Sequence, residues 1–150
     1  MNERPWQLRL ACPADRDFLY ALNAATMREH AEKVWGWDEA EQAVFFDNRF
    51  RPDDWQVIQA DGQDIGVLIV EEDDEQIYLA EIQILPESQG RGIGSAIVRE
   101  LMQTATATGK PLTLRVLHVN SRARALYARL GFRQFKEIET HAYLRWDPAA

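Results

Sequence analysis

Hydrophobic and polar positions follow two different periods along this chain, and the changes between them mark the predicted elements. Apolar residues spaced three and four apart predict helices, whereas alternation at every second position predicts strands. The predicted helices run from about Pro13 to Lys33, from Asp38 to before Pro52, from about Gln89 to Gly109, and from Asn120 or Ser121 to Gly131. The predicted strands are Trp6–Leu10, Trp55–Ala60, Asp64–Val70, Gln76–Leu85, Leu112–His118, Phe132–Ile138 and Ala142–Trp146. The order β-α-α-β-β-β-α-β-α-β-β predicts an α/β (α+β) fold, with a mixed sheet flanked by helices.

Short polar signals support these boundaries. Asp38 is a predicted N-cap with Glu41 three residues later, which is typical of a helix start. Asp61-Gly62 is a two-residue hairpin signal between two predicted strands. Gly109 and Gly131 follow the last apolar residues of two predicted helices, where a glycine commonly ends a helix.

Composition limits the class of protein. A chain of 150 residues, 46% of them hydrophobic, with no repeat or linker, predicts a single folded domain over residues 1–150. The longest apolar run, Ile65–Val70, is far too short to span a membrane. Met1–Trp6 lacks the apolar core of a secretion signal, and Cys12 is the only cysteine. We therefore expect a cytoplasmic protein without a disulfide, and no metal site.

Charge is unevenly distributed in the sequence. The net charge is -7, with the acidic excess in residues 1–86 and a basic excess in residues 87–150. Two surfaces with different partners would explain the difference, although charges that merely keep the surface hydrated would explain it as well. The basic residues form no continuous run, so nucleic-acid binding is not expected.

The segment Gln89-Gly90-Arg91-Gly92-Ile93-Gly94-Ser95 lies between a predicted strand and a predicted helix. Glycines allow a tight backbone turn there, and the N–H groups of the first helical turn favour an anion. The segment therefore predicts a cradle for a phosphate or pyrophosphate, with a glycine-rich turn without a ligand as the alternative. It lacks the lysine of a Walker motif, and its glycine spacing does not fit the dinucleotide fingerprint of an oxidoreductase.

Two blocks of this sequence resemble the GNAT (GCN5-related) N-acetyltransferase family. Gln89–Gly94 resembles the Q/R-x-x-G-x-G/A acyl-CoA signature of that family. Asn120–Ala123, Leu126–Tyr127 and Leu130–Phe132 resemble its second motif, N-x-x-A-x-x-L-Y-x-x-x-G-F. The resemblance implies a single-domain acetyl-CoA-dependent N-acetyltransferase, an acyltransferase whose acceptor is the primary amine of a small molecule, peptide or protein. The positions that it implies for acetyl-CoA binding are Ile82, Ile84, Gln89, Gly90, Arg91, Gly92, Ile93, Gly94, Ser95, Asn120 and Ala123.

The same resemblance gives two residues catalytic roles. Tyr127 would be the general acid that protonates the leaving thiolate, although its helical spacing also fits simple packing. Glu81 would be the general base, because a carboxylate in an otherwise apolar strand is costly unless it has a function or a partner. A solvent-facing or ion-paired glutamate is the alternative.

The acceptor side is predicted with less support from motifs. Trp35 and Trp37, two indoles beside acidic residues, suit a cationic amine, although they also suit a helix junction filled by aromatic rings. Glu29 and His141 are further candidates for binding the acceptor. The alternative to an enzyme is a non-catalytic acyl-CoA sensor or partner-binding module on the same fold. The sequence does not fix the oligomeric state, and a small homodimer is common among similar proteins.

Overall fold

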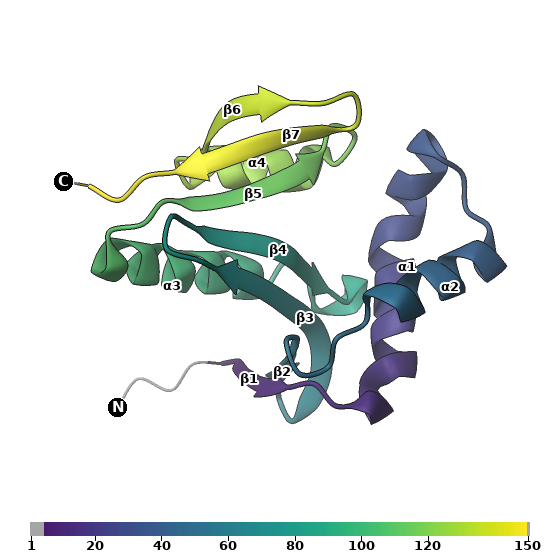
Figure 1. Cartoon of the computed structure of the whole chain (residues 1–150). Coiled ribbons are helices and arrows are strands. Elements are labelled where there is room, and N and C mark those ends of the chain that lie inside the picture. The colour runs from purple at the N-terminus through teal and green to yellow at the C-terminus, as the bar shows by residue number, and fades with distance from the viewer. Residues whose placement is uncertain (1–4, 150) are drawn as a thin grey trace. The chain divides into compact units, whose positions relative to one another are not determined.

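The computed structural model describes residues 5–149. It confirms the predicted order of helices and strands (Figure 1). The prediction that Met1–Trp6 is not a secretion signal falls mostly on residues 1–4, which lie outside the described residues. The elements are β1 (Gln7–Leu10), η1 (Pro13–Asp15), α1 (Arg16–Val34), α2 (Glu39–Arg49), β2 (Gln56–Ala60), β3 (Gln63–Glu72), β4 (Ile77–Ile84), η2 (Pro86–Ser88), α3 (Ile93–Thr108), β5 (Leu112–Leu117), α4 (Ser121–Arg129), β6 (Arg133–Glu137) and β7 (His141–Trp146).

The seven strands form a mixed sheet in the order β1-β2-β3-β4-β5-β7-β6. β1, β2 and β3 pair in antiparallel fashion, β4 and β5 are parallel, and β7 is antiparallel to both β5 and β6. The chain divides into two compact units, which we call the first unit (Met1–Ile69 with Glu81–Ile93) and the second unit (Val70–Ala80 with Gly94–Ala150). A single domain over residues 1–150 stays a prediction.

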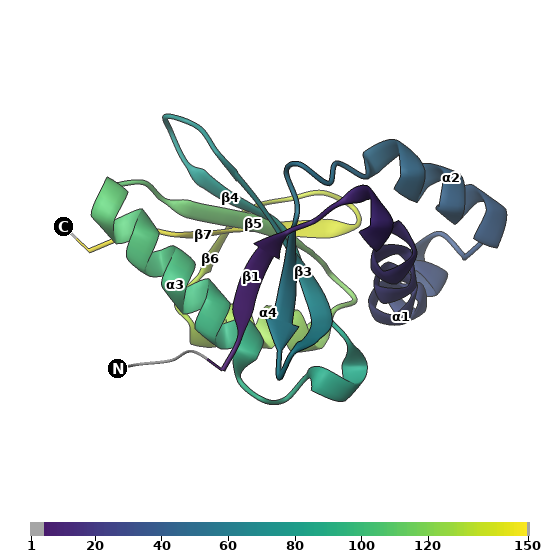
Figure 2. The same cartoon turned by 90° about the horizontal axis from the view of Figure 1, so that it is seen from below.

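The core of the first unit lies between strands and the two N-terminal helices. α1 and α2 lie side by side in both views (Figure 2). The ring of Phe46 on α2 packs edge-on against Tyr20 of α1 at 5.6 Å and against Trp55 at 5.8 Å. Leu19 and Leu22 of α1 are fully buried. Burial of these large side chains provides most of the driving force that holds the helices on the strands.

Backbone geometry explains why glycine stands at two positions of the first unit, Gly62 and Gly66. Asp61 and Gly62 have φ angles of 54° and 75°, so the predicted hairpin turn between β2 and β3 is confirmed. At Gly66 on β3 an added Cβ would stand 2.3 Å from the carbonyl oxygen of Gln83. Only glycine therefore allows β3 to approach β4 at this point.

A partly buried ionic network joins β1, η1 and β3 in the first unit. Arg9 donates two hydrogen bonds to the carboxylate of Asp15, at 2.9 and 2.8 Å, and a third to Asp64 at 3.0 Å. Gln59 donates to the other carboxylate oxygen of Asp64 at 2.8 Å. The Arg9 hydrogen bonds lower the pKa of Asp15 from 3.8 to about 2.

The second unit is built around β5. Leu112, Leu114 and Leu117 of this strand are buried, and β5 pairs along its whole length with β7, which separates it from β6 (Figure 1). Ile97 and Val98 of α3 are also fully buried, as the predicted apolar face of this helix requires.

The structure moves two of the predicted boundaries. β3 continues two residues past Val70 to Glu72, whose carboxylate is bound by Lys110 at 2.7 Å in the second unit. α3 begins at Ile93 instead of near Gln89, because Gly90 and Gly92 have positive φ angles that a right-handed helix does not accept.

Candidate functional site

The glycine loop before α3 has the geometry of an anion cradle. Gly90 and Gly92 have φ angles of 80° and 78°, whereas Arg91 between them does not have a positive φ. Alternating backbone handedness of this kind turns successive N–H groups toward one side, which creates a concave site for an anion. An added Cβ at either glycine would meet no other atom within 4 Å, so the space beside the loop is open.

Two side chains of this loop are already engaged within the first unit. Gln89 donates from Nε2 to the carbonyl oxygen of Ile84 at 2.8 Å, which ties the loop to the end of β4. Arg91 donates from Nη2 to Asp61 at 2.8 Å, in an exposed ion pair. The carbonyl of Ile84 is thus occupied, and the half-buried Ile82 lies two residues earlier on the same strand.

The second unit holds the remaining predicted cofactor positions. Gly94 and Ser95 form the first turn of α3 and are half-buried. Asn120 is the N-cap of α4, because its Oδ1 accepts a hydrogen bond from the backbone N–H of Ala123 at 3.2 Å. The predicted cap is therefore confirmed, and the predicted cofactor contact of Asn120 and Ala123 stays a prediction.

Tyr127 lies on the buried face of α4. Its side chain is 7% exposed, and its ring packs edge-on against Phe132 at 5.5 Å. The packing interpretation of Tyr127 is thereby confirmed. It is compatible with an acid role, because a ring fixed by packing holds its hydroxyl in one place.

Glu81 lines a small cavity of the first unit. Its side chain is 25% exposed and lies 3.9 Å from Nη2 of Arg49, the last residue of α2. The ion-paired alternative for Glu81 therefore has a definite partner. The cavity measures about 10 Å³ and is lined by Leu19, Asn23, Phe46, Arg49, Trp55, Val67, Ile69, Glu81 and Gln83.

Three polar residues of this cavity were not predicted from the sequence as part of a site. Gln83 is buried and donates from Nε2 to Oδ1 of Asn23 on α1 at 3.0 Å. Arg49 carries the charge opposite Glu81. A glutamine two residues after Glu81 in an apolar strand was the available signal, whereas nothing local marks Asn23 or Arg49.

The predicted acceptor residues of the first unit lie apart from this cavity. Trp35, Trp37 and Glu29 are not among the described residues that line it. Trp35 is 61% exposed, and Glu29 lies 3.8 Å from Lys33 on the surface of α1. The ring of Trp37 is covered by the guanidinium of Arg28 at 5.9 Å, so this face already carries a cation.

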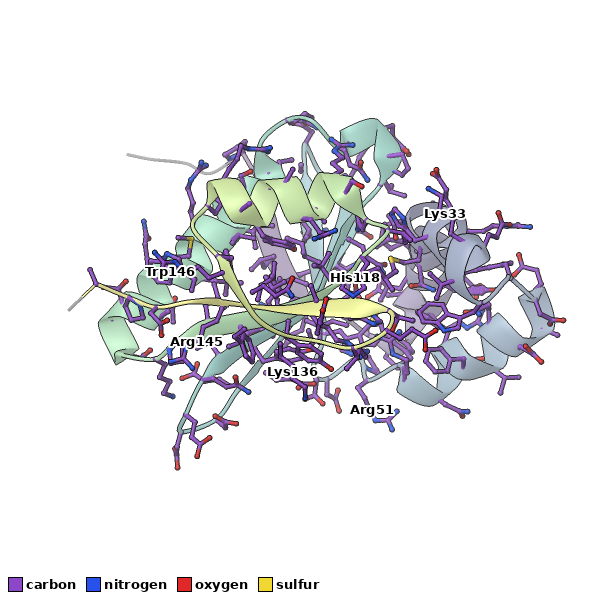
Figure 3. The ribbon with its side chains drawn as sticks, turned by 90° about the horizontal axis from the view of Figure 1, so that it is seen from above. Lys33, Arg51, His118, Lys136, Arg145 and Trp146 are labelled. Atoms are coloured by element: carbon purple, nitrogen blue, oxygen red, sulfur yellow. The ribbon has the colours of Figure 1, made fainter. Side chains whose placement is uncertain are left out.

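His141 lies at the start of β7 in the second unit. Its Nδ1 is 2.7 Å from Oγ1 of Thr140, and burial, with the nearby charges of Arg115 and His118, lowers its pKa. The lowered pKa favours the neutral form of His141. His118, labelled in Figure 3, instead holds the turn before β7, because its Nε2 lies 2.9 Å from the carbonyl oxygen of Ile138.

The described residues include neither a metal-binding cluster nor a membrane-spanning helix. Within residues 5–149, no three His, Cys, Asp or Glu side chains are grouped so that they could hold a metal ion. No helix in the same part of the chain has the length and apolar character needed to cross a bilayer.

Solved structures identify the class of fold. PaiA N-acetyltransferase from Thermoplasma acidophilum, in complex with coenzyme A, matches 95% of this chain and 98% of its own, with a TM-score of 0.76 at 14% identity. An acetyltransferase from Thermus thermophilus matches 98% of this chain and 99% of its own, with a TM-score of 0.75 at 19% identity. The mixed sheet with its glycine loop between β4 and α3 is therefore an acetyltransferase fold.

Sequence comparison then places the chain within a family. The sequence model of the Acetyltransferase (GNAT) family matches residues 18–132, and the chain belongs to that family. The thialysine N-epsilon-acetyltransferases of Bos taurus and Sus scrofa are 39% and 37% identical to it over 75 residues, or 49% of this chain. The aligned region spans only 44% of the length of these curated relatives.

Proposed function

We propose that this chain is an acetyl-CoA-dependent N-acetyltransferase that acetylates a primary amine by direct attack, without a covalent enzyme intermediate. The observation that carries the proposal is the glycine loop, with left-handed backbone at Gly90 and Gly92 and open space beside both, in a member of the Acetyltransferase (GNAT) family. Such a loop suits the pyrophosphate of coenzyme A, because backbone N–H groups bind phosphate oxygens without a charged side chain.

The proposed cofactor residues divide by the part of acetyl-CoA that they would hold. The segment from Gln89 to Ser95 would hold the pyrophosphate, and Arg91 would add a positive charge. Backbone groups at Ile82 and Ile84 would bind the pantetheine arm and the acetyl carbonyl, with Ile84 acting through its N–H because Gln89 occupies its carbonyl. Asn120 and Ala123 would border the same arm.

Acid and base roles are proposed for one residue of each unit. Acetyl-CoA supplies a thioester whose acetyl carbon is attacked by the amine nitrogen as the carbon–sulfur bond breaks. Glu81 would accept the proton that the acceptor ammonium loses, directly or through one water, for which the cavity of about 10 Å³ has room. Tyr127 would donate a proton to the leaving sulfur, which otherwise departs as a thiolate, and would regain a proton as the attacking nitrogen loses its second one.

The acceptor class is proposed as a primary amine. The Glu81 carboxylate would attract a cationic amine at the cavity, and Glu29, Trp35 and Trp37, which do not line the cavity, would attract it from outside. The partially matching relatives carry the name of an amino-acid acetyltransferase, so amino acids belong in the acceptor panel. His141, whose lowered pKa favours the neutral form, would contact the acceptor with little repulsion of its ammonium. A homodimer in the cytoplasm remains part of the proposal.

The test is a binding and turnover experiment on the purified chain. We expect acetyl-CoA and CoA to raise Tm, NAD and ATP to have little effect, and CoA to be released when a panel of amino acids, polyamines and peptides is supplied. Gly92→Val should abolish cofactor binding, because it closes the open space and disfavours the positive φ. No response to acetyl-CoA would refute the proposal, and binding without turnover would support the acyl-CoA sensor instead.

A further inference from the structure

The cavity of the first unit contains two opposite charges that are held apart. Nη2 of Arg49 and Oε2 of Glu81 are separated by 3.9 Å, beyond the distance of a hydrogen bond between them. A guanidinium and a carboxylate in close contact normally share bidentate bonds below 3 Å. The separation leaves the guanidinium of Arg49 with capacity for the negative charge of a ligand.

These two charges lie at different depths. The side chain of Glu81 is 25% exposed and that of Arg49 is 40% exposed, so Arg49 lies nearer to solvent. Arg49 is held there by the ring of Phe45, whose centroid is 5.5 Å from the guanidinium carbon. The cavity thus has a carboxylate inside and a guanidinium at its mouth.

The remaining lining limits what can enter. Apolar side chains form one wall, and the hydrogen-bonded amides of Asn23 and Gln83 form the polar wall. A volume of about 10 Å³ holds one group of the size of a water molecule, and an ammonium head is such a group. The rest of an acceptor must extend toward Arg49.

We infer that the acceptor is an amine that also carries a carboxylate, with its ammonium at Glu81 and its carboxylate at Arg49. This inference rests on the proposed function and narrows its substrate class to amino acids and similar zwitterions. The guanidinium binds a carboxylate well, and it repels the second positive charge of a diamine or polyamine. Glu81 alone would favour polycations, and Arg49 reverses that preference.

The experiment compares acceptors that differ by one carboxylate. L-Lysine and cadaverine, and L-ornithine and putrescine, are matched pairs in which decarboxylation removes the anionic group. We expect kcat/KM to be at least about tenfold higher for each amino acid, mainly through a lower KM, as one added charge-assisted contact implies. Turnover in which the decarboxylated amines are equal or better would overturn the inference.

Variants of Arg49 and Arg51 test whether the preference for amino acids over decarboxylated amines depends on the cavity. Arg49→Met keeps a long side chain against Phe45 and removes the charge, so the amino-acid preference should largely disappear. Arg49→Lys keeps the charge and should retain part of it. Arg51→Met is the matched control, because Arg51 lies outside the cavity and bonds to the carbonyl oxygens of Asn48 and Phe50 (Figure 3).

The outcomes separate the two proposals. A full amino-acid preference in Arg49→Met, or its loss in Arg51→Met, would overturn this inference while acetyl transfer stands. Absence of acetyl-CoA binding and of CoA release with every amine would refute the proposed function, and this inference with it.

Discussion

At the scale of single residues, the side chains with proposed chemical roles are fixed by their neighbours. The ring of Tyr127 packs against Phe132, and Glu81 lines a cavity of apolar and amide side chains, 3.9 Å from Arg49. Groups fixed in this way need little reorganisation when a reaction begins. Conservative substitutions can therefore separate their chemistry from their packing.

Tyr127→Phe removes the hydroxyl and retains the ring. We expect kcat to fall by roughly 100-fold, a typical loss for a general acid, with little change in Tm or in the Kd of acetyl-CoA. Tyr143→Phe is the control, because its ring packs against Phe135 at 6.2 Å and it has no proposed catalytic role. An unchanged kcat in Tyr127→Phe would leave Tyr127 a packing role alone.

Glu81→Gln keeps the shape of the side chain and removes its basicity. We expect the ratio of wild-type to variant kcat/KM to be largest at low pH, where the acceptor amine is protonated and needs a base. At high pH the free amine attacks without help, so the ratio should fall. Steady-state rates across pH measure this ratio, with Glu71→Gln, at an exposed glutamate near the end of β3, as the control. A flat ratio would exclude Glu81 as the base.

At the scale of elements, local sequence patterns were sufficient to predict the order of the helices and strands. The hairpin at Asp61 and Gly62 and the caps at Asp38 and Asn120 formed where short-range signals predicted them, because each depends on neighbours within a few residues. Only boundaries moved, as at α3, where positive φ angles at Gly90 and Gly92 delay the helix.

The cavity could not be predicted in the same way. Gln83 and Asn23 are hydrogen-bonded across 60 positions of sequence, and Arg49 meets Glu81 from a different element. Period and composition carry no information about such contacts, which form only when helices pack on strands. The proposed catalytic and cofactor residues came from motifs, whereas the groups opposite Glu81 in the cavity required the structure.

The cap of α4 gives a test at this scale. Asn120→Ala should lower the free energy of unfolding by about 1 kcal/mol, because the N–H of Ala123 loses its acceptor. Asn120→Asp keeps the acceptor and should restore stability in urea unfolding. If Asn120 also contacts the cofactor arm, Asn120→Asp should weaken acetyl-CoA binding. Equal affinity would remove that contact, and full stability of Asn120→Ala would contradict the cap.

At the scale of the whole molecule, the Arg9 network should govern resistance to acid. The folded pKa of Asp15 is about 2, below its value of 3.8 in the absence of these contacts. The folded state therefore binds this proton less tightly than the unfolded state, and the stabilisation is complete above about pH 4 and lost as pH falls through 2. Its full size is about 2 kcal/mol.

Urea unfolding of the wild type and of Asp15→Asn between pH 5 and 2 measures this contribution. We expect the difference in unfolding free energy between the two proteins to shrink steadily as pH falls. A difference that stays constant over this range would show that protonation of Asp15 contributes nothing to acid unfolding.

The ion pair between Arg91 and Asp61 has a consequence for cofactor binding. Asp61 accepts a hydrogen bond from the Arg91 guanidinium that is proposed to bind the pyrophosphate. The Asp61 carboxylate would therefore compete with the pyrophosphate for Arg91. Asp61→Asn, which tolerates the positive φ of this turn, should tighten acetyl-CoA binding a few-fold in calorimetry. Asp53→Asn removes the same charge elsewhere in the first unit and should have less effect, whereas unchanged or weaker binding in Asp61→Asn would show no rivalry. If Arg91 binds the pyrophosphate, the intact pair would lower the affinity for acetyl-CoA, and it would favour release of CoA after the reaction because Asp61 re-forms its ion pair with Arg91 as the cofactor leaves.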